Sequence, residues 1–188
     1  IDLAAALAQA GDGRAGEMFA RAEAAAPRRV AFDSLSRAPV LGKLAVALAQ
    51  AGDPRADQVF AEAQDIARDL EALYEVEWRD WKDQAFRALA ADLLKAGRYD
   101  DVKDLVSRMQ IEAERATVLH DLANALVQAG RYGEAEDVAK SILIDRVRAR
   151  ALGDLAAALA RTGDSQTRQV FAEAEAATRS EYNLPQAQ

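Results

Sequence analysis

The apolar residues of this chain recur in a short phrase that is repeated along its whole length. Two clear copies are LANALVQAG, which ends at Gly130, and LAAALARTG, which ends at Gly163, 33 residues later. Related copies are LAAALAQAG from Leu3, LAVALAQAG from Leu44 and LAADLLKAG from Leu89. A fixed period of this length is typical of helix pairs that stack in a row, so the sequence predicts an all-α chain.

Each copy predicts a first helix with one apolar stripe. Leucines lie eight and four residues before the glycine, and a leucine or phenylalanine lies eleven residues before it. Spacings of three and four residues place these side chains on one face of a helix. Alanines lie seven residues before each glycine, where a neighbouring helix can approach closely. The four columns are Leu41, Phe86, Leu119 and Leu152; Leu3, Leu44, Leu89, Leu122 and Leu155; Leu7, Leu48, Leu93, Leu126 and Leu159; and Ala4, Ala45, Ala90, Ala123 and Ala156.

A second helix is predicted after each glycine, because a further apolar run follows every turn. The first of these helices is expected over about residues 14–26, before Pro27, and the second is expected to continue past Leu70. Residues 28–35 are expected to form a connector, with Pro39 in the first turn of the next helix, where its missing N–H costs little. The apolar faces comprise Met18, Phe19 and Ala22; Val59, Phe60 and Ala63; Val102, Leu105, Val106 and Met109; Ala135, Val138, Ala139 and Ile142; and Val170, Phe171 and Ala174.

These elements predict a single helical-repeat domain over residues 1–188. The repeats are expected at about 1–26, 36–76, 78–109, 111–142 and 144–179, with a frayed tail over 180–188. The first copy starts only ten residues before Gly11, so its first helix is short, and we expect the chain to be a fragment of a longer one. Trp78 falls in an apolar column and is expected in the core. Trp81 is expected to be at best half-buried, and partner binding is an alternative role for it.

Two of the turns resemble those of the tetratricopeptide repeat, in which paired helices are joined by a turn of the form G-x-Y-x-E-A. Gly130, Tyr132, Glu134 and Ala135 match this form fully, and the turn that begins at Gly97 matches in part. The remaining turns keep the glycine without the tyrosine. The resemblance implies a right-handed α-solenoid of about five antiparallel helix pairs, whose first helices line a concave groove. A HEAT-type stack is the structural alternative, because glycine spacings of 41 and 45 residues also occur here.

The resemblance is limited by two departures from the family pattern, at the early aromatic position and at the closing proline. The large aromatic residue early in the first helix is replaced by Leu119 or Leu152, and the small residue four positions later is Ala123 or Ala156. The proline that usually closes the second helix is absent. The chain is therefore described as tetratricopeptide-like along its length.

Composition restricts the classes of partner. The net charge of −7 argues against a general nucleic-acid binder, which would present a basic face. No apolar run is long enough to cross a bilayer. The chain has no cysteine, so it has no disulfide framework and no thiolate metal site, which fits a cytoplasmic location.

The sequence offers no convergent set of catalytic groups, so we expect no enzymatic activity and no cofactor. His120 is the only histidine, and it has no cysteine or second histidine with which to hold a metal. Carboxylate pairs such as Asp100 with Asp101 lie on second helices and are interpreted as solvated acids favoured by the helix dipole.

The remaining candidate for function is the surface formed by the first helices. Its polar positions include basic residues although the chain is acidic, which favours a protein or peptide ligand that carries carboxylates. Asn124 also matches the position at which related peptide-binding repeats hold a carboxylate. The predicted groove residues are Arg87, Lys95, His120, Asn124, Gln128, Arg150 and Arg161, with Gln84, Ala91 and Thr117 on the same side.

The function of the chain has several interpretations at this point. The polar residues could simply solvate a concave face, and Asp121 and Asp154 would dilute its positive potential. The leading hypothesis is a non-catalytic protein-interaction scaffold. Its alternative is a sensor or regulatory array attached to a catalytic domain, such as a signalling ATPase, outside this sequence. Self-association through exposed repeat ends is the third possibility.

Overall fold

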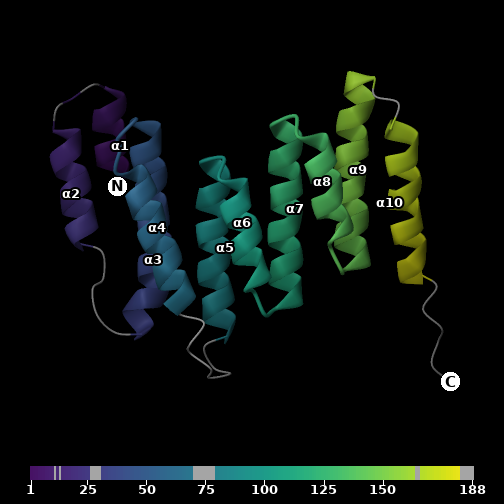
Figure 1. Ribbon diagram of the computed structural model, residues 1–188, viewed down its shortest axis with the longest axis horizontal. Coiled ribbons are helices and arrows are strands. Elements are labelled where there is room, and N and C mark those ends of the chain that lie inside the picture. Colours follow the sequence, from purple (N-terminus) through teal and green to yellow (C-terminus); the bar gives the residue numbers. More distant parts are fainter. Residues whose placement is uncertain (11, 13, 26–30, 70–78, 164–165, 183–188) are drawn as a thin grey trace. The chain divides into compact units, whose positions relative to one another are not determined.

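A computed structural model of the chain describes residues 1–188 except 11, 13, 26–30, 70–78, 164–165 and 183–188. The described residues are helical and contain no strand, as the periodicity predicts (Figure 1). The helices are α1 (Asp2–Gln9), α2 (Ala15–Ala25), α3 (Ala31–Gln50), α4 (Ala56–Asp69), α5 (Arg79–Lys95), α6 (Tyr99–Ser107), α7 (Glu112–Gln128), α8 (Tyr132–Lys140), α9 (Asp145–Thr162) and α10 (Thr167–Tyr182).

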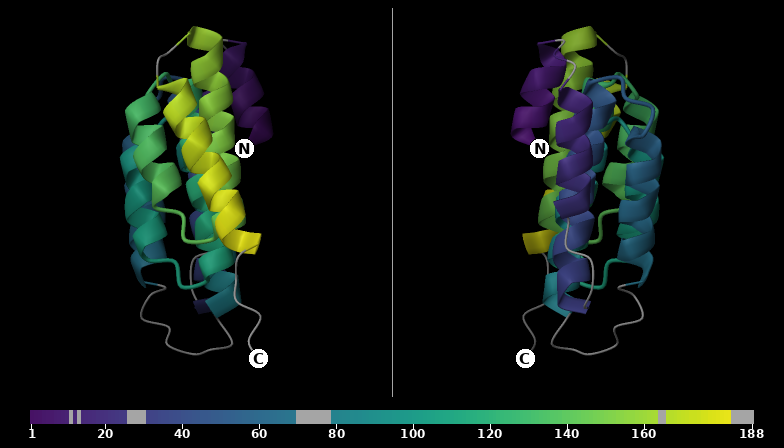
Figure 2. Two further views of the ribbon diagram at one scale, coloured as in Figure 1. Left: turned by 90° about the vertical axis from the view of Figure 1, so that its right-hand side faces the viewer. Right: turned by 90° about the vertical axis from the view of Figure 1, so that its left-hand side faces the viewer.

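The helices group into two compact units, Ile1–Gln110 and Ile111–Gln188. In the first unit α1 packs on α2, α3 on α4 and α5 on α6, and α3 also lies against both α1 and α5. In the second unit α7 packs on α8, and α9 contacts α7, α8 and α10. The side views of Figure 2 agree that α9 and α10 lie side by side. Within each unit, therefore, consecutive first helices are neighbours, and each has its own second helix beside it.

Glycine forms the turn inside four of the helix pairs because the backbone there is left-handed. Gly52, Gly97, Gly130 and Gly163 have φ between 68° and 74°. After Gly97 and Gly130 the next residue donates its N–H to a carbonyl one turn back in the first helix, from Arg98 to Leu93 O at 2.9 Å and from Arg131 to Leu126 O at 2.9 Å. This 6→1 bond is the Schellman ending of a helix, and it satisfies a carbonyl that the helix itself leaves free.

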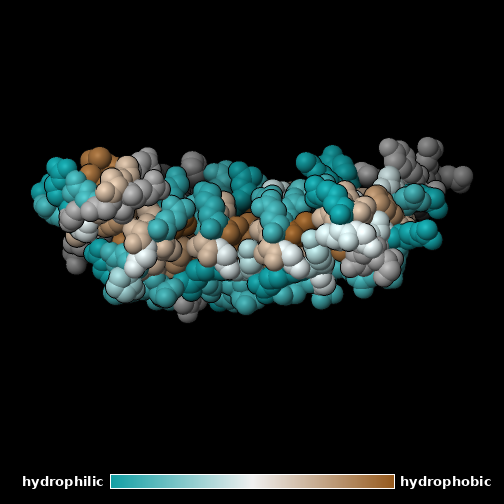
Figure 3. Space-filling model, turned by 90° about the horizontal axis from the view of Figure 1, so that it is seen from above, coloured by the Kyte–Doolittle hydropathy of each residue, from teal (hydrophilic) through white to brown (hydrophobic). Residues whose placement is uncertain are grey.

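The predicted columns form the core of both units. The alanine column is buried at Ala45, Ala90, Ala123 and Ala156, each at most 1% exposed. The leucines eight residues before the glycine are fully buried at positions 44, 89, 122 and 155. Hydrophilic side chains cover much of the remaining surface, as the face drawn in Figure 3 shows.

Two members of the predicted apolar faces are exposed. Leu3 is 64% exposed and Phe171 is 44% exposed. The equivalent residues Leu89 and Phe60 are buried because another helix pair of the first unit lies over each of them. The preceding pair covers Leu89, and the following pair covers Phe60. Helices α1 and α10 have no such neighbour within their own units.

The predicted boundaries are wrong at two places. Helix α3 begins at Ala31 rather than after a connector over 28–35, so Pro39 lies inside the helix and not in its first turn. A proline lacks the N–H that would bond one turn back, which is why the sequence favoured a start near it. Helix α10 continues to Tyr182, so residues 180–182 belong to it and not to a tail.

Three predictions fall outside the described part of the structure. The continuation of the helix past Leu70 and the core position of Trp78 belong to residues 70–78, which are not described. Trp81 lies in α5, but its side chain is not described. These expectations stay predictions.

Candidate functional site: a basic pocket between α7 and α9

The polar stripes of α7 and α9 meet in the second unit. His120, Asn124 and Gln128 follow one another at four-residue intervals on α7, so they share a face of that helix. On α9 the corresponding side is formed by Arg150, Asp154 and Arg161. His120 joins the two stripes, because its Nε2 lies 3.1 Å from Asp154 Oδ2 and 3.3 Å from Asn124 Nδ2.

A pocket of about 370 Å³ opens beside this histidine and is lined by Thr117, His120, Arg146, Val147 and Arg150. Its walls come from the first half of α7 and the first two turns of α9. The volume is within the range of about 300–1,000 Å³ that small ligands occupy in proteins. The lining is polar on four of five residues, which suits a charged group better than an apolar one.

The two arginines of the pocket are the groups most open to a ligand. Arg146 and Arg150 are one turn apart on α9 and exposed, and neither has an ion pair or hydrogen bond among the described residues. Arg148, which lies between them in sequence, is instead held by the Ile142 carbonyl at 3.1 Å and by Asp145. Two neighbouring guanidinium groups without partners can donate several hydrogen bonds to carboxylate or phosphate oxygens.

Acidic residues limit the positive potential of the site. Asp154 is engaged by His120, and Asp121 Oδ1 lies 3.7 Å from His120 Nδ1. Both carboxylates are about half exposed, at 49% and 55% of their side-chain area. An anion would be held on the Arg146 and Arg150 side of the pocket.

The structure divides the predicted groove residues between the two units. His120 and Arg150 line the pocket, and Asn124 contacts His120. Gln128 and Arg161 are exposed nearer the ends of α7 and α9 and do not line it. Arg87 and Lys95 lie on α5 in the first unit, where Lys95 Nζ pairs with Asp92 at 3.0 Å.

Arg146 was not among the predicted site residues. It lies in the first turns of α9, ahead of the leucine columns by which the copies were aligned. The available signal was its spacing of four residues from Arg150, which places both side chains on one helix face.

A second cavity, between α8, α9 and α10, is occupied by charges of the chain itself. Lys140 Nζ lies 2.6 Å from Glu136 Oε1 and 2.9 Å from Glu173 Oε2. Hydrogen bonds to Glu136 and then Glu173 raise the pKa of Lys140, and the hydrogen bond from Lys140 lowers the pKa of Glu173. This cavity of about 360 Å³ therefore contains an internally neutralised cluster rather than a free charge.

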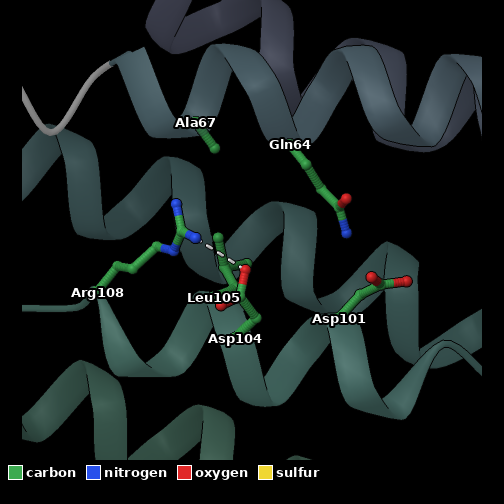
Figure 4. A pocket seen from close by; sticks show the side chains of 6 residues that line it. All are labelled: Gln64, Ala67, Asp101, Asp104, Leu105 and Arg108. Atoms are coloured by element: carbon green, nitrogen blue, oxygen red, sulfur yellow. Dashed lines mark hydrogen bonds and ion pairs between the residues drawn. The ribbon is translucent and has the colours of Figure 1, made fainter.

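The small cavity between α4 and α6 holds no more than a water molecule. Figure 4 shows Gln64 and Ala67 of α4 opposite Asp101, Asp104 and Leu105 of α6 and Arg108, which directly follows α6. Arg108 is bonded to Asp104 at 2.9 Å. Its volume is about 10 Å³, close to the lower limit for one water. The acids of α6 that the sequence assigns to a solvated face are engaged by basic neighbours, as in the pair of Asp101 with Arg98.

The described residues form neither a metal-binding cluster nor a membrane-spanning helix. No group of three or more His, Asp or Glu side chains is placed so that it could hold a metal ion. None of the described helices combines the length and the apolar character that crossing a membrane requires. Comparison of the chain with protein-family models, with curated proteins and with solved structures gave no match.

Proposed function

We propose that this chain is a non-catalytic protein-interaction module that binds an acidic protein segment at the pocket between α7 and α9. The observation that carries the proposal is the pair Arg146 and Arg150, two exposed guanidinium groups that face one cavity and have no partner among the described residues. Many other arginines of the chain are paired with carboxylates, for example Arg55 with Asp53 and Arg131 with Glu134. A carboxylate supplied by a partner would complete the same kind of pairing.

The architecture within which the pocket lies is proposed to be a right-handed α-solenoid of tetratricopeptide-like helix pairs. Supporting this, each unit contains consecutive pairs joined by glycine turns, and the first helices of neighbouring pairs pack on one another. Such repeats present side chains from adjacent first helices on one continuous surface, which suits an extended segment. The ligand expected on this surface is a peptide with aspartate or glutamate side chains, or a free carboxyl terminus, oriented by Arg146, Arg150 and His120.

The proposal is tested by replacing both pocket arginines with glutamate. The probe is a short fluorescent polyglutamate peptide, and binding is followed by anisotropy at low and high salt. Charge-assisted hydrogen bonds contribute about 1.5–3 kcal/mol each, so the double variant Arg146→Glu/Arg150→Glu is expected to weaken binding by at least about tenfold. Binding by the unaltered chain should also decline with salt, because exposed charges are screened over about 8 Å at physiological ionic strength.

A control with the same change in net charge separates the pocket from the general field of the protein. Arg21→Glu/Arg179→Glu alters two exposed arginines on α2 and α10, far in sequence from the pocket. This variant should bind the peptide nearly as the unaltered chain does. Equal loss in both variants, or no binding by the unaltered chain, would contradict the proposal.

A further inference from the structure

The packing of α3 on α5 shows how one helix pair is seated on the next. Gly42 lies ten residues before Gly52, and a Cβ placed on it would come within 2.8 Å of Leu89 Cδ1 and 3.4 Å of Asp92 Oδ2. Leu89 and Asp92 lie eight and five residues before Gly97, on the first helix of the following pair. A leucine of one pair therefore occupies the space that the missing side chain of a glycine leaves on the preceding pair.

The glycine position and the leucine position of this contact both recur elsewhere in the chain, on α9 and on α1. Gly153 on α9 lies ten residues before Gly163, the same position as Gly42, and nothing lies within 4 Å of its Cβ site. Leu3 on α1 lies eight residues before the first turn glycine, the same position as Leu89, and it is 64% exposed. Thus α9 has open space beside its glycine, where the leucine of a following pair would pack. Helix α1 has the equivalent leucine in an exposed position.

The second helices repeat this relation with their charges exchanged. On α4 the ring of Phe60 is covered by the Arg98 guanidinium at 4.7 Å, and Arg98 also pairs with Asp57 at 3.0 Å. On α10 the equivalent of Phe60 is Phe171, which is 44% exposed, and the equivalent of Asp57 is the exposed Arg168. The residue that occupies the position of Arg98 in the first turn of the chain is Asp12. Arg168 and Asp12 are thus complementary, in the reverse order of Asp57 and Arg98.

Asp12 is available to such a contact although it already has a partner. Arg14 binds it at 2.7 Å, in the same way as Arg55 binds Asp53 in the next turn of this type. A carboxylate can accept from two guanidinium groups at once, since each oxygen has two lone pairs. Asp12 would then lie between Arg14 of its own copy and Arg168 of the other.

We infer that two copies of this chain associate head to tail through these faces, with Leu3 of one copy packed against Gly153 of the other. In the same contact the turn between α1 and α2 lies over Phe171, with Asp12 beside Arg168. The interface is heterologous, because the two copies contribute different surfaces, so each copy keeps one free face and can add another. Gly153 lies one turn from Arg150 on α9, so this contact adjoins the pocket between α7 and α9. The substitutions that test it lie on α1 and α10, so its failure can be distinguished from that of the proposed function.

The inference is tested with one substitution on each face. Sedimentation or light scattering over a range of concentrations should show the mass of the unaltered chain rising above that of one copy. Leu3→Glu and Phe171→Glu each place a charge in the contact, and both positions are exposed in the single chain, so folding should be preserved. Each variant alone is expected to associate at least about tenfold more weakly, as for the loss of one buried leucine or phenylalanine contact.

Mixing the two variants gives the decisive measurement. The Leu3→Glu chain keeps an intact α9 and α10 face, and the Phe171→Glu chain keeps an intact α1 face, so the mixture should form one-to-one dimers and nothing larger. Leu143→Glu is the control, because Leu143 is 66% exposed but lies outside both faces, and it should associate like the unaltered chain. Any one of three results would overturn the inference. The first is that the unaltered chain has the mass of one copy at every concentration. The second is that the Phe171→Glu chain associates by itself, and the third is that the mixture of the two variants contains only single copies.

Discussion

Glycine at one repeat position has opposite surroundings in α3 and α9. A Cβ on Gly42 would come within 2.8 Å of Cδ1 of the fully buried Leu89, whereas the space beside Gly153 is open. Both glycines lie inside helices, where alanine is favoured over glycine by about 0.8–1 kcal/mol. The consequence of adding one methyl group therefore depends only on the neighbour.

Gly42→Ala is expected to destabilise the chain, and Gly153→Ala to stabilise it. Overpacking against Leu89 costs about 1–3 kcal/mol, which the helical preference of alanine offsets only in part. At Gly153 that preference acts alone, for a gain of up to about 1 kcal/mol. Urea unfolding at a protein concentration low enough to keep single copies measures both. Changes of the same sign at the two sites would show that Gly42 is not closely packed.

The sequence identified the apolar columns but not the two buried acids of α5. Asp83 and Asp92 stand where the aligned copies carry alanine, and they are 0% and 2% exposed. Asp83 accepts the backbone N–H of Gln110 at 3.1 Å, and Asp92 pairs with Lys95. Periodicity places a residue on a helix face, but it does not reveal the loop N–H or the ammonium group that makes a buried carboxylate acceptable.

At the level of the helix, packing between helices determines where α3 begins, and the local sequence signals do not. Pro39 suggested a helix start, yet α3 begins at Ala31 and passes through it. Ala38 and Leu41 on either side are buried, and α3 contacts α1, α4 and α5. Burial of this kind can outweigh the cost of about 3 kcal/mol or more for a proline inside a helix. The turn glycines gave the remaining boundaries, because left-handed backbone at a helix end strongly favours glycine.

The ion pair that connects α8 with α10 predicts a pH-dependent contribution to stability. The hydrogen bond from Lys140 holds the pKa of Glu173 below its ordinary value, so the unfolded chain binds a proton more readily than the folded one. The contribution is therefore present above the ordinary pKa of glutamate and is lost as the pH falls through the lowered one. Glu173→Gln should reduce stability near pH 7, by under about 1 kcal/mol because the ammonium group is 43% exposed.

Urea midpoints at neutral pH and near the acid limit of folding measure this difference. The gap between the unaltered chain and Glu173→Gln should narrow in acid. Glu175→Gln is the matched control on the same helix, since Glu175 pairs at 3.2 Å with Arg179 and both side chains are mostly exposed. Its effect should be small at both pH values. A gap for Glu173→Gln that stayed constant or widened in acid would show that the ion pair does not stabilise the fold.

For the whole molecule, the repeat pattern predicts one continuous row, which stays a prediction, and the contacts among the described helices group into two compact units. The predicted groove combined residues of α5 with residues of α7 and α9, because a shared register was its only criterion. Within the second unit the structure brings members on α7 and α9 together and adds Arg146 from the same face of α9, while the members on α5 belong to the first unit. Register describes where a side chain lies on its own helix. It cannot tell which cations are already paired, and that distinction separates Lys95 from Arg146 and Arg150.

Stability should also vary along the molecule, with α1 the first element to open. Its leucine at position 3 is exposed and Leu7 is only half-buried, whereas the same columns in α3, α5, α7 and α9 are buried. In stacked repeats each pair is stabilised mainly by its neighbours, and local opening free energies range from near zero to the global value. Amide exchange at low protein concentration is therefore expected to be fastest in α1 and α2 within the first unit, and slow in α3 and α5.

Raising the protein concentration should protect α1 selectively if a second copy packs on Leu3. A ligand that binds only the closed form stabilises it in proportion to the logarithm of its concentration above the dissociation constant. Exchange in α1 should then slow with concentration, while α3, which has α1 on one side and α5 on the other, should not change. The Leu3→Glu chain supplies the control, because its α1 should exchange rapidly at every concentration. Uniform protection of α1 and α3 at low concentration would contradict the expected order of opening. Rapid, concentration-independent exchange in the unaltered chain would instead argue that the α1 face remains free.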